Sequence, residues 1–179
     1  MISANALAAA LPYVLMAPKT DAVITSLCLR PSFGERTFPS RIQMTRAAGI
    51  PGERWLTLPW IKLPDGSPDP RIQISILPAR VMDLVWQNRE TTPHPGDPIV
   101  ADMDMSVANL PTGTLIAAGT AVLRVSDLPN NGCVKWKFRY GSAAMDWIEV
   151  DPNLRLRGVL CSVEVDGEVG LSDRLQVLR

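Results

Sequence analysis

The chain has 179 residues, of which 46% are apolar, which is enough for one domain with a full core and too little for two comfortable ones. Its 18 basic and 18 acidic residues give no net charge, so no nucleic-acid partner is expected and any bound anion must be held by a local cluster of cations. We predict a single domain over residues 1–179.

The apolar run at residues 2–17 has no lysine or arginine before Lys19, which a secretory signal would need near its start. The run contains Pro12 and is short for a membrane span, so no membrane association is expected. We predict that residues 1–20 form a helical segment packed on the domain, with helix over residues 4–10; a cleaved signal is the alternative. The three cysteines have no paired spacing, so the sequence suggests neither a disulfide framework nor a zinc site and favours a cytoplasmic location.

Sixteen prolines and 12 glycines divide the chain into short runs rich in β-branched residues, a pattern typical of β proteins. Isoleucine alternates with polar residues within residues 71–77, which predicts a half-buried strand. Further strands are predicted at residues 23–29, 157–165 and 175–178, a hairpin at 114–127, a turn at 166–169, and short helices at 78–88 and after Ser142. The predicted fold class is therefore mainly β, with mostly antiparallel strands closed into a barrel and a few short peripheral helices.

Cys133 is the cysteine with the most positively charged sequence neighbours. It follows the turn-rich residues 128–132 and precedes Lys135, Lys137 and Arg139. If residues 134–140 form a strand, Cys133 shares a face with all three cations; if they form a helix, it neighbours Lys137. Either arrangement favours the thiolate, the form that attacks electrophiles and binds soft metals. The alternative is that Cys133 is a small buried residue at the end of a turn.

The other candidates for chemistry are weaker. Cys161 lies on the apolar face of a predicted strand and Cys28 in an apolar run, so both are predicted to be core residues. His94 is flanked by Pro93 and Pro95, which favours a surface loop over a catalytic triad or a metal cluster. No glycine spacing matches a phosphate-binding loop.

Several short motifs in a fixed order resemble the MOSC family, named for the C-terminal domain of molybdenum cofactor sulfurases, in its stand-alone bacterial form. The matching segments are Arg30-Pro31, Gly34-Glu35-Arg36, Gly49-Ile50-Pro51-Gly52-Glu53-Arg54-Trp55, residues 104–111 with Asn109-Leu110-Pro111, Gly113, Gly119, Gly132-Cys133-Val134-Lys135-Trp136, Leu156-Arg157-Gly158-Val159 and Gly167-Glu168-Val169. Two positions depart from the usual family pattern, because Glu53 stands where Asp is common and Trp136 where Phe is usual. The resemblance implies a MOSC-type β-barrel.

The resemblance also implies a role for Cys133, which would either ligate the molybdenum of the molybdenum cofactor (molybdopterin) or carry a persulfide. Both fit a thiolate, since it is a soft ligand. The implied pocket is rimmed by Arg36, Arg54, Asn109 and Lys135, and its cations would hold the cofactor phosphate.

Three functions stay open at this point. The first is a molybdenum-dependent reductase of N-hydroxylated small molecules, which would need an electron-donor protein because the chain has no cysteine set for an iron–sulfur cluster. The second is a sulfur transferase that receives a persulfide from a cysteine desulfurase. The third is a non-catalytic β-barrel interaction module.

Overall fold

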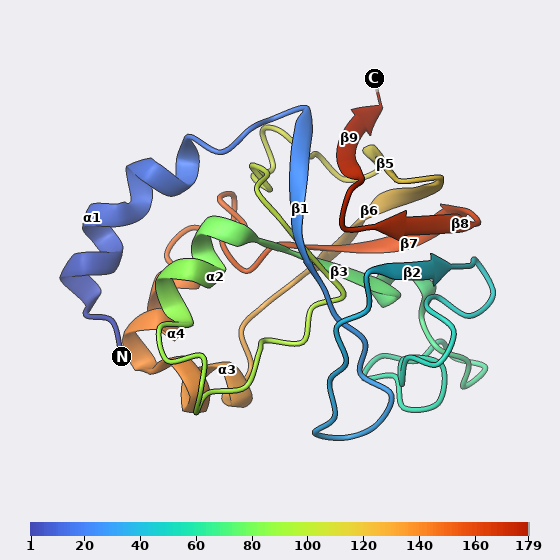
Figure 1. Ribbon diagram of the computed structural model, residues 1–179, viewed down its shortest axis with the longest axis horizontal. Helices are drawn as coiled ribbons and strands as arrows, with labels where there is room; N and C mark the ends of the chain where they lie inside the picture. Colours follow the sequence, from blue (N-terminus) through green and yellow to red (C-terminus); the bar gives the residue numbers. More distant parts are fainter. Residues whose placement is uncertain (179) are drawn as a thin grey trace.

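A closed seven-stranded barrel with helices on one side is seen in the computed structural model, which describes residues 1–178 (Figure 1). The strands are β1 (Asp21–Leu27), β2 (Arg41–Met44), β3 (Ile74–Pro78), β4 (Ile99–Ala101), β5 (Leu115–Ala118), β6 (Ala121–Pro129), β7 (Val159–Val165), β8 (Gly167–Gly170) and β9 (Arg174–Leu178). The helices are α1 (Ala4–Leu15), the short 3₁₀ turn η1 (Pro70–Ile72), α2 (Ala79–Val85), α3 (Val134–Tyr140) and α4 (Ser142–Ile148). The predicted fold class, mainly β with peripheral helices, is confirmed.

The barrel order is β1-β4-β3-β7-β6-β5-β9, and β9 pairs with β1 to close it. All ladders of the barrel are antiparallel except that between β3 and β4. These two strands are parallel because α2 follows β3 and carries the chain back along the outside, as a parallel pair requires.

Strands β2 and β8 pair with each other in a separate two-stranded sheet and were not predicted. The prediction of a turn at residues 166–169 is wrong over β8. Gly167 suggested a turn, but a Cβ there would overlap the backbone of Thr120 and Ala121, so the glycine marks a close approach of two chain segments.

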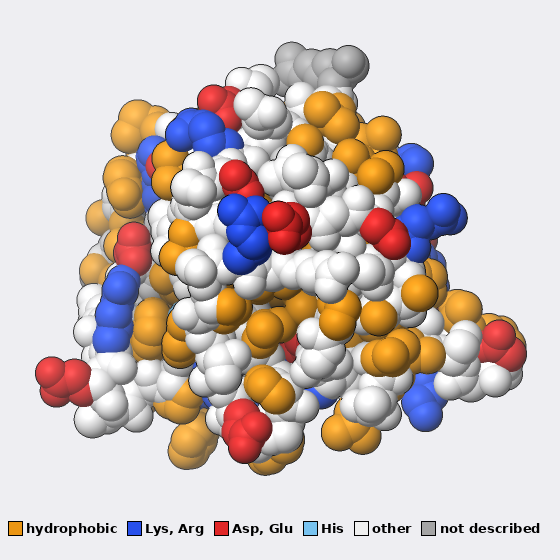
Figure 2. Space-filling model, turned by 45° about the vertical axis from the view of Figure 1, so that its right-hand side comes forward, with side chains coloured by type: hydrophobic (Ala, Val, Ile, Leu, Met, Phe, Trp, Pro, Cys, Tyr) orange, Lys and Arg blue, Asp and Glu red, His pale blue; other side chains and the backbone are white. Residues whose placement is uncertain are grey.

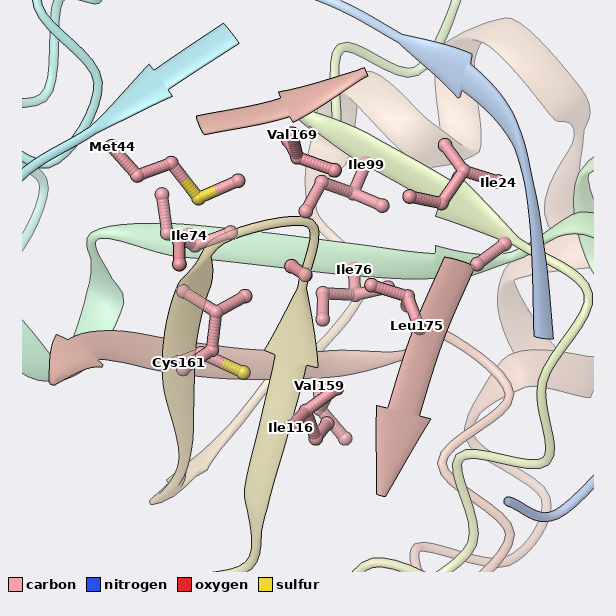
Figure 3. Close-up of a cluster of buried hydrophobic side chains, with 14 of the residues drawn as sticks. Ile24, Met44, Ile74, Ile76, Ile99, Ile116, Val159, Cys161, Val169 and Leu175 are labelled. Carbon is pink, nitrogen blue, oxygen red and sulfur yellow. The ribbon is translucent and has the colours of Figure 1, made fainter. Parts of the chain in front are cut away.

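The inside of the barrel holds the main apolar core, and Figure 3 shows its side chains converging from different strands. Ile74 and Ile76 point inward from β3, as their alternation predicts. Cys161 lies among them and is fully buried, which confirms its prediction as a core residue. Burial of one such isoleucine side chain contributes about 1.5–3 kcal/mol to folding.

A second apolar cluster joins the helices to the outside of the barrel. Leu77 and Val100 of the barrel face this layer, and α1 contributes Leu7 and Val14. The Ser3 hydroxyl begins α1 by accepting a hydrogen bond from the Ala6 N–H (3.2 Å). The N-terminal helix therefore extends beyond the predicted residues 4–10 and packs on α2 and α4, and none of the helices within residues 1–178 is long and apolar enough to cross a membrane.

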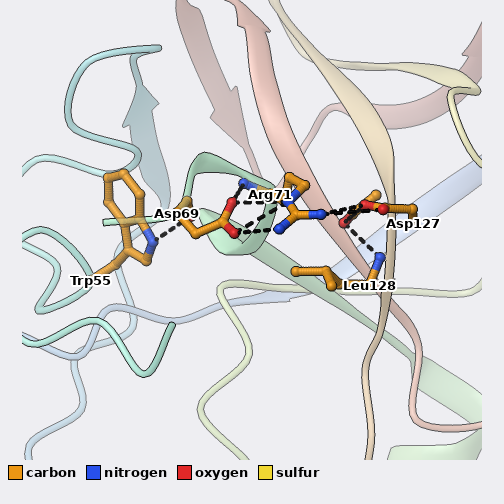
Figure 4. A network of polar contacts seen from close by, with 6 residues as sticks. Trp55, Asp69, Arg71, Asp127 and Leu128 are labelled. Atoms are coloured by element: carbon orange, nitrogen blue, oxygen red, sulfur yellow. Dashed lines mark hydrogen bonds and ion pairs between the residues drawn. The ribbon is translucent and has the colours of Figure 1, made fainter. Parts of the chain in front are cut away.

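A polar network fixes the long segment between β2 and β3 to one end of the barrel (Figure 4). Arg71 donates to the carboxylate of Asp69 (2.8 Å) and to that of Asp127 on β6 (3.2 Å). The Trp55 indole donates to the Asp69 carbonyl (3.3 Å). Because Arg71 bridges the two carboxylates, it holds this segment against the end of β6, beside the site described next.

Candidate functional site

Cys133 is exposed and lies immediately before α3. Residues 134–140 are thus helical, which is one of the two predicted alternatives. Trp136 and Tyr140, four residues apart, are buried with their rings in edge contact at 4.8 Å. They fix the helix against the molecule. The alternative of a buried structural Cys133 is excluded by its exposure.

A hollow of about 190 Å³, here called the cationic hollow, opens beside Cys133. Its cationic lining residues are Arg30, Arg36, Arg54, Lys135, Arg139 and Arg157, and its one acidic lining residue is Glu35. Four of the predicted site residues therefore meet here: Cys133, Arg36, Arg54 and Lys135. Figure 1 shows part of this arrangement, because the loop after β1 runs to the lower end of the molecule towards α3. Arg54 comes from a third segment, the one between β2 and β3.

Most cations of the cationic hollow have no acidic partner. Arg30 pairs with Glu53 at 2.6 Å and Arg157 with Asp97 at 2.8 Å. Within the described chain, Arg36, Arg54, Lys135 and Arg139 make no ion pair, and Lys135 lies over the Phe33 ring at 4.4 Å. The hollow thus concentrates uncompensated positive charge that suits an anion.

The crowding of these arginines has an electrostatic cost. Burial, followed by repulsion from Arg139, lowers the pKa of Arg36. Burial, followed by repulsion from Arg30, lowers the pKa of Arg54. The Arg36 Nε is buried and has no hydrogen-bond partner among the described residues. A bound anion would relieve both the repulsion and the missing bond.

A second and larger cavity of about 560 Å³, here called the amphipathic cavity, adjoins the first. It shares Cys133, Lys135 and three arginines with the cationic hollow, so Cys133 lies on their common wall. The rest of its lining includes both apolar and polar side chains. The large apolar ones are Trp60, Ile61, Ile72, Leu128 and Leu160, and the polar ones are Gln73, Ser75, Asp97, Asn130 and Asn131. Such a lining suits a flat heterocycle with both an apolar face and hydrogen-bonding edges.

Exposed apolar side chains are common on the long segments near the site. Leu56, Leu58, Trp60 and Phe33 are all exposed there. Figure 2 shows apolar side chains gathered along the lower part of the face it presents, between scattered charged ones.

Asn109 is not at either hollow, although it was predicted to rim the pocket. Its amide donates to the carbonyl oxygens of Lys19 (2.9 Å) and Asp104 (2.8 Å). Both donors of the amide are therefore used to fix the chain before β5, which leaves Asn109 with a local structural role.

Three lining arginines and an acid were not among the predicted site residues. Arg30 and Arg157 stand in motifs that resemble the MOSC family, and Arg139 belongs to the basic run after Cys133, so the sequence held a signal for each. Asp97 carried no such signal, because only the fold brings it beside Arg157.

The three cysteines are expected to differ strongly in reactivity. Burial raises the pKa of Cys28 to about 11 and that of Cys161 to about 12, while Cys133 is exposed. Alkylation with iodoacetamide at pH 8 should therefore modify Cys133 at least about 100-fold faster than the other two, since thiolate fraction and access both favour it. Peptide mass spectrometry of timed samples measures the rates, and similar rates at all three sites would contradict this assignment.

His94 is buried, with 3% of its surface exposed, so its prediction as a surface residue is wrong. The rings of Phe38 and Trp86 lie edge-on to it at 5.2 and 5.1 Å, and its Nδ1 accepts a hydrogen bond from the Gly96 N–H (3.0 Å). Burial lowers the pKa of His94 from its ordinary 6.5 to about 4. The flanking prolines gave no sign of the two aromatic rings that cover it.

Folding stability should fall in mild acid because of His94. Between pH 6.5 and pH 4 the unfolded chain binds a proton at this residue that the folded chain excludes, so the free energy of unfolding decreases as the pH falls through this range. By pH 5 the loss should be about 2 kcal/mol. Urea unfolding at pH 7 and pH 5 measures it, and His94→Asn, which keeps an acceptor for Gly96 but cannot titrate, should lose less; equal losses would refute the assignment.

Neither a protein-family model nor a curated protein sequence matches the chain. Solved structures do resemble it. The YuaD protein from Bacillus subtilis is 19% identical, with a TM-score of 0.63 over 90% of this chain and 98% of that one. YiiM from Escherichia coli is 16% identical, with a TM-score of 0.57 over 89% of this chain and 70% of that one. A protein described only as hypothetical is also 16% identical, with a TM-score of 0.60 over 90% of this chain and 68% of that one. At these identities the likeness shows a shared fold.

Proposed function

We propose that this protein is a MOSC-type protein that binds molybdenum cofactor and uses Cys133 as a ligand of the metal. The observation that supports this proposal is the place of Cys133, an exposed thiol on the wall between the cationic hollow and the amphipathic cavity. The cationic hollow suits the phosphate of a phosphorylated pterin, and the amphipathic cavity suits its ring system.

The residues fit such a group in three respects. Arg36 has a buried Nε without a partner, and with Arg54 it can hold a phosphate through guanidinium forks while Lys135 adds a point charge. The amphipathic cavity offers room and mixed polarity for the ring system. Among residues 1–178 no three His, Cys, Asp or Glu side chains gather as a metal site, so a metal at Cys133 takes its remaining ligands from the cofactor.

In this proposal the enzyme reduces N-hydroxylated small molecules. The bound cofactor supplies two-electron redox chemistry at its metal. Overall the N–O bond breaks and two electrons come from a donor protein; one proton converts the departing hydroxyl to water and a second proton is taken up by the nitrogen. Trp60 and Ile61 offer apolar surface for the substrate at the mouth of the amphipathic cavity, next to Cys133.

Sulfur transfer is the second candidate, and the exposure of Cys133 favours it. The Cys133 thiolate would attack the outer sulfur of a persulfide on a desulfurase, forming a persulfide on Cys133 while the sulfur–sulfur bond to the donor breaks and the donor cysteine leaves as a thiolate. This route needs a partner protein to reach the cysteine, and the apolar side chains exposed nearby offer a contact surface.

Purification from a host that makes molybdenum cofactor separates these functions. Molybdenum near one atom per chain, with a released fluorescent pterin, would support cofactor binding. A mass increment of one sulfur atom on Cys133 would support sulfur transfer. Absence of both signals would leave the interaction module.

Loss of one hollow cation should weaken the cofactor site without harming the fold. Arg54→Ala is expected to lower cofactor retention by about tenfold or more, because hydrogen bonds to a charged group are worth about 1.5–3 kcal/mol. Stability should change by less than about 0.5 kcal/mol, since Arg54 makes no ion pair in the described chain.

Molybdenum content after dialysis, read beside the melting temperature, measures both effects. Arg41→Ala is the matched control, because Arg41 is an exposed arginine on β2, paired with Glu168 and away from both hollows. Full retention of cofactor by Arg54→Ala would show that the phosphate is held elsewhere.

A further inference from the structure

Asp97 is a buried acid with one carboxylate oxygen left without a partner. Only 2% of the residue is exposed, and its Oδ1 accepts a hydrogen bond from Arg157 Nη1 (2.8 Å). The Oδ2 is buried and has no donor among residues 1–178. A buried acceptor in this state costs free energy unless something donates to it.

The place of Asp97 indicates what could donate. It lines the amphipathic cavity and is the one acidic residue in the described lining. Arg157 is itself fixed, since its guanidinium lies 4.7 Å from the centre of the Trp136 ring. The carboxylate is therefore held in one orientation at the cavity wall.

The neighbouring polar residues are less available. The Gln73 amide donates to the Arg46 carbonyl (2.8 Å) and accepts from the Val163 N–H (2.9 Å). The Asn130 amide donates to the Arg157 carbonyl (3.1 Å). The Ser75 hydroxyl also lies near Asp97 and helps to lower its pKa, but it does not reach hydrogen-bonding geometry with Oδ2. Asp97 Oδ2 is thus an acceptor on this wall that stays open to a donor on a ligand.

Asp97 stays ionised in the folded protein. Burial opposes its charge, but the charge and hydrogen bond of Arg157, with smaller contributions from Ser75 and Arg30, hold the pKa of Asp97 below its usual range. An ionised carboxylate accepts hydrogen bonds and donates none. It therefore favours an N–H group and disfavours a carbonyl oxygen at the same position.

We propose that Asp97 is a specificity-determining residue whose Oδ2 accepts a hydrogen bond from the amino-substituted edge of the pterin ring in the amphipathic cavity. This inference rests on the proposed function, because it takes a pterin as the occupant of that cavity. The ring system would then be recognised by a hydrogen bond to Asp97, in addition to the phosphate contacts in the cationic hollow.

The test compares two fluorescent heterocycles that differ at one substituent. 6-Hydroxymethylpterin carries an amino group where 6-hydroxymethyllumazine carries a carbonyl oxygen. Fluorescence titration of the full chain, purified from a host unable to make molybdenum cofactor, gives both dissociation constants. The parent should bind the pterin at least about tenfold more tightly, as expected for one charge-assisted hydrogen bond.

Asp97→Asn should reduce this preference to less than about threefold, because an amide can present either a donor or an acceptor. Asp102→Asn is the matched control: Asp102 also pairs with an arginine, Arg80 (2.7 Å), but lines neither hollow, so it should keep the full preference. The parent measurement stands by itself if Asp97→Asn does not fold.

Equal binding of both heterocycles by the parent, or an unchanged preference in folded Asp97→Asn, would overturn the role of Asp97 while leaving the pterin site in place. Binding of neither heterocycle would overturn this inference together with the proposed pterin site. Molybdenum retention in the cofactor-loaded protein then shows whether the metal and phosphate part of the proposed function survives.

Discussion

Cys133→Ser is expected to give a folded protein that retains almost no molybdenum. A serine hydroxyl is a hard and weakly acidic ligand, whereas the thiolate is soft and binds metals of this kind well. The cations of the cationic hollow are unchanged by the substitution, so affinity for inorganic phosphate should stay close to that of the parent. Because Cys133 is exposed, the melting temperature should move little.

Molybdenum analysis, phosphate titration and thermal unfolding of the same preparation measure the three expectations. Phe138→Ser is the matched control, because Phe138 lies on α3, the helix that follows Cys133, is 86% exposed and lines neither hollow. Parent-like molybdenum in Cys133→Ser would remove the metal-ligand role and leave only the anion site.

Gly158→Ala should destabilise the protein by at least about 3 kcal/mol. Gly158 precedes β7 with a φ of +89°, a conformation that an L-residue adopts only with strain. A Cβ at this position would also overlap the backbone carbonyl of Ile76 on β3. Relief would require β3 and β7 to separate, and the same shift would move Arg157 away from Asp97.

Gly66→Ala isolates the contribution of the backbone conformation. Gly66 has a similar φ of +85°, but nothing lies within 4 Å of the position its Cβ would take. Its substitution should cost only about 1–2 kcal/mol. Urea unfolding of both variants gives the comparison, and equal losses would show that the approach of β3 to residue 158 is not as close as described.

The fold class was predictable because the alternation of apolar and polar residues in the sequence matches the burial of side chains in the barrel. Ile74 and Ile76 alternate with polar residues because one side of β3 faces the barrel interior, and this alternation is visible in the amino-acid sequence alone. Strand β4 could not be recognised in the same way. Its three residues are all buried, on both sides of the barrel wall, so no alternation marks them.

Part of the candidate site was predictable from features that are local in the sequence. The local charge around Cys133 and the motif order brought out Cys133, Arg36, Arg54 and Lys135, and these line one hollow. The position of Asn109 depends on which backbone carbonyls its amide meets after folding, and a linear sequence does not contain that information. Their roles toward a cofactor stay predictions.

The closure of the barrel has a consequence for when the site comes into being. Strand β1 begins at Asp21, but its closing partner β9 ends at Leu178, so the barrel stays open during synthesis until the last strand has left the ribosome. Arg157, which lines both cavities, is also made late, roughly 120 residues after the loop that carries Arg36. A nascent chain thus holds only fragments of the anion site until Arg157 has been made, so a ligand that needs all of its cations binds only after that residue has joined the others.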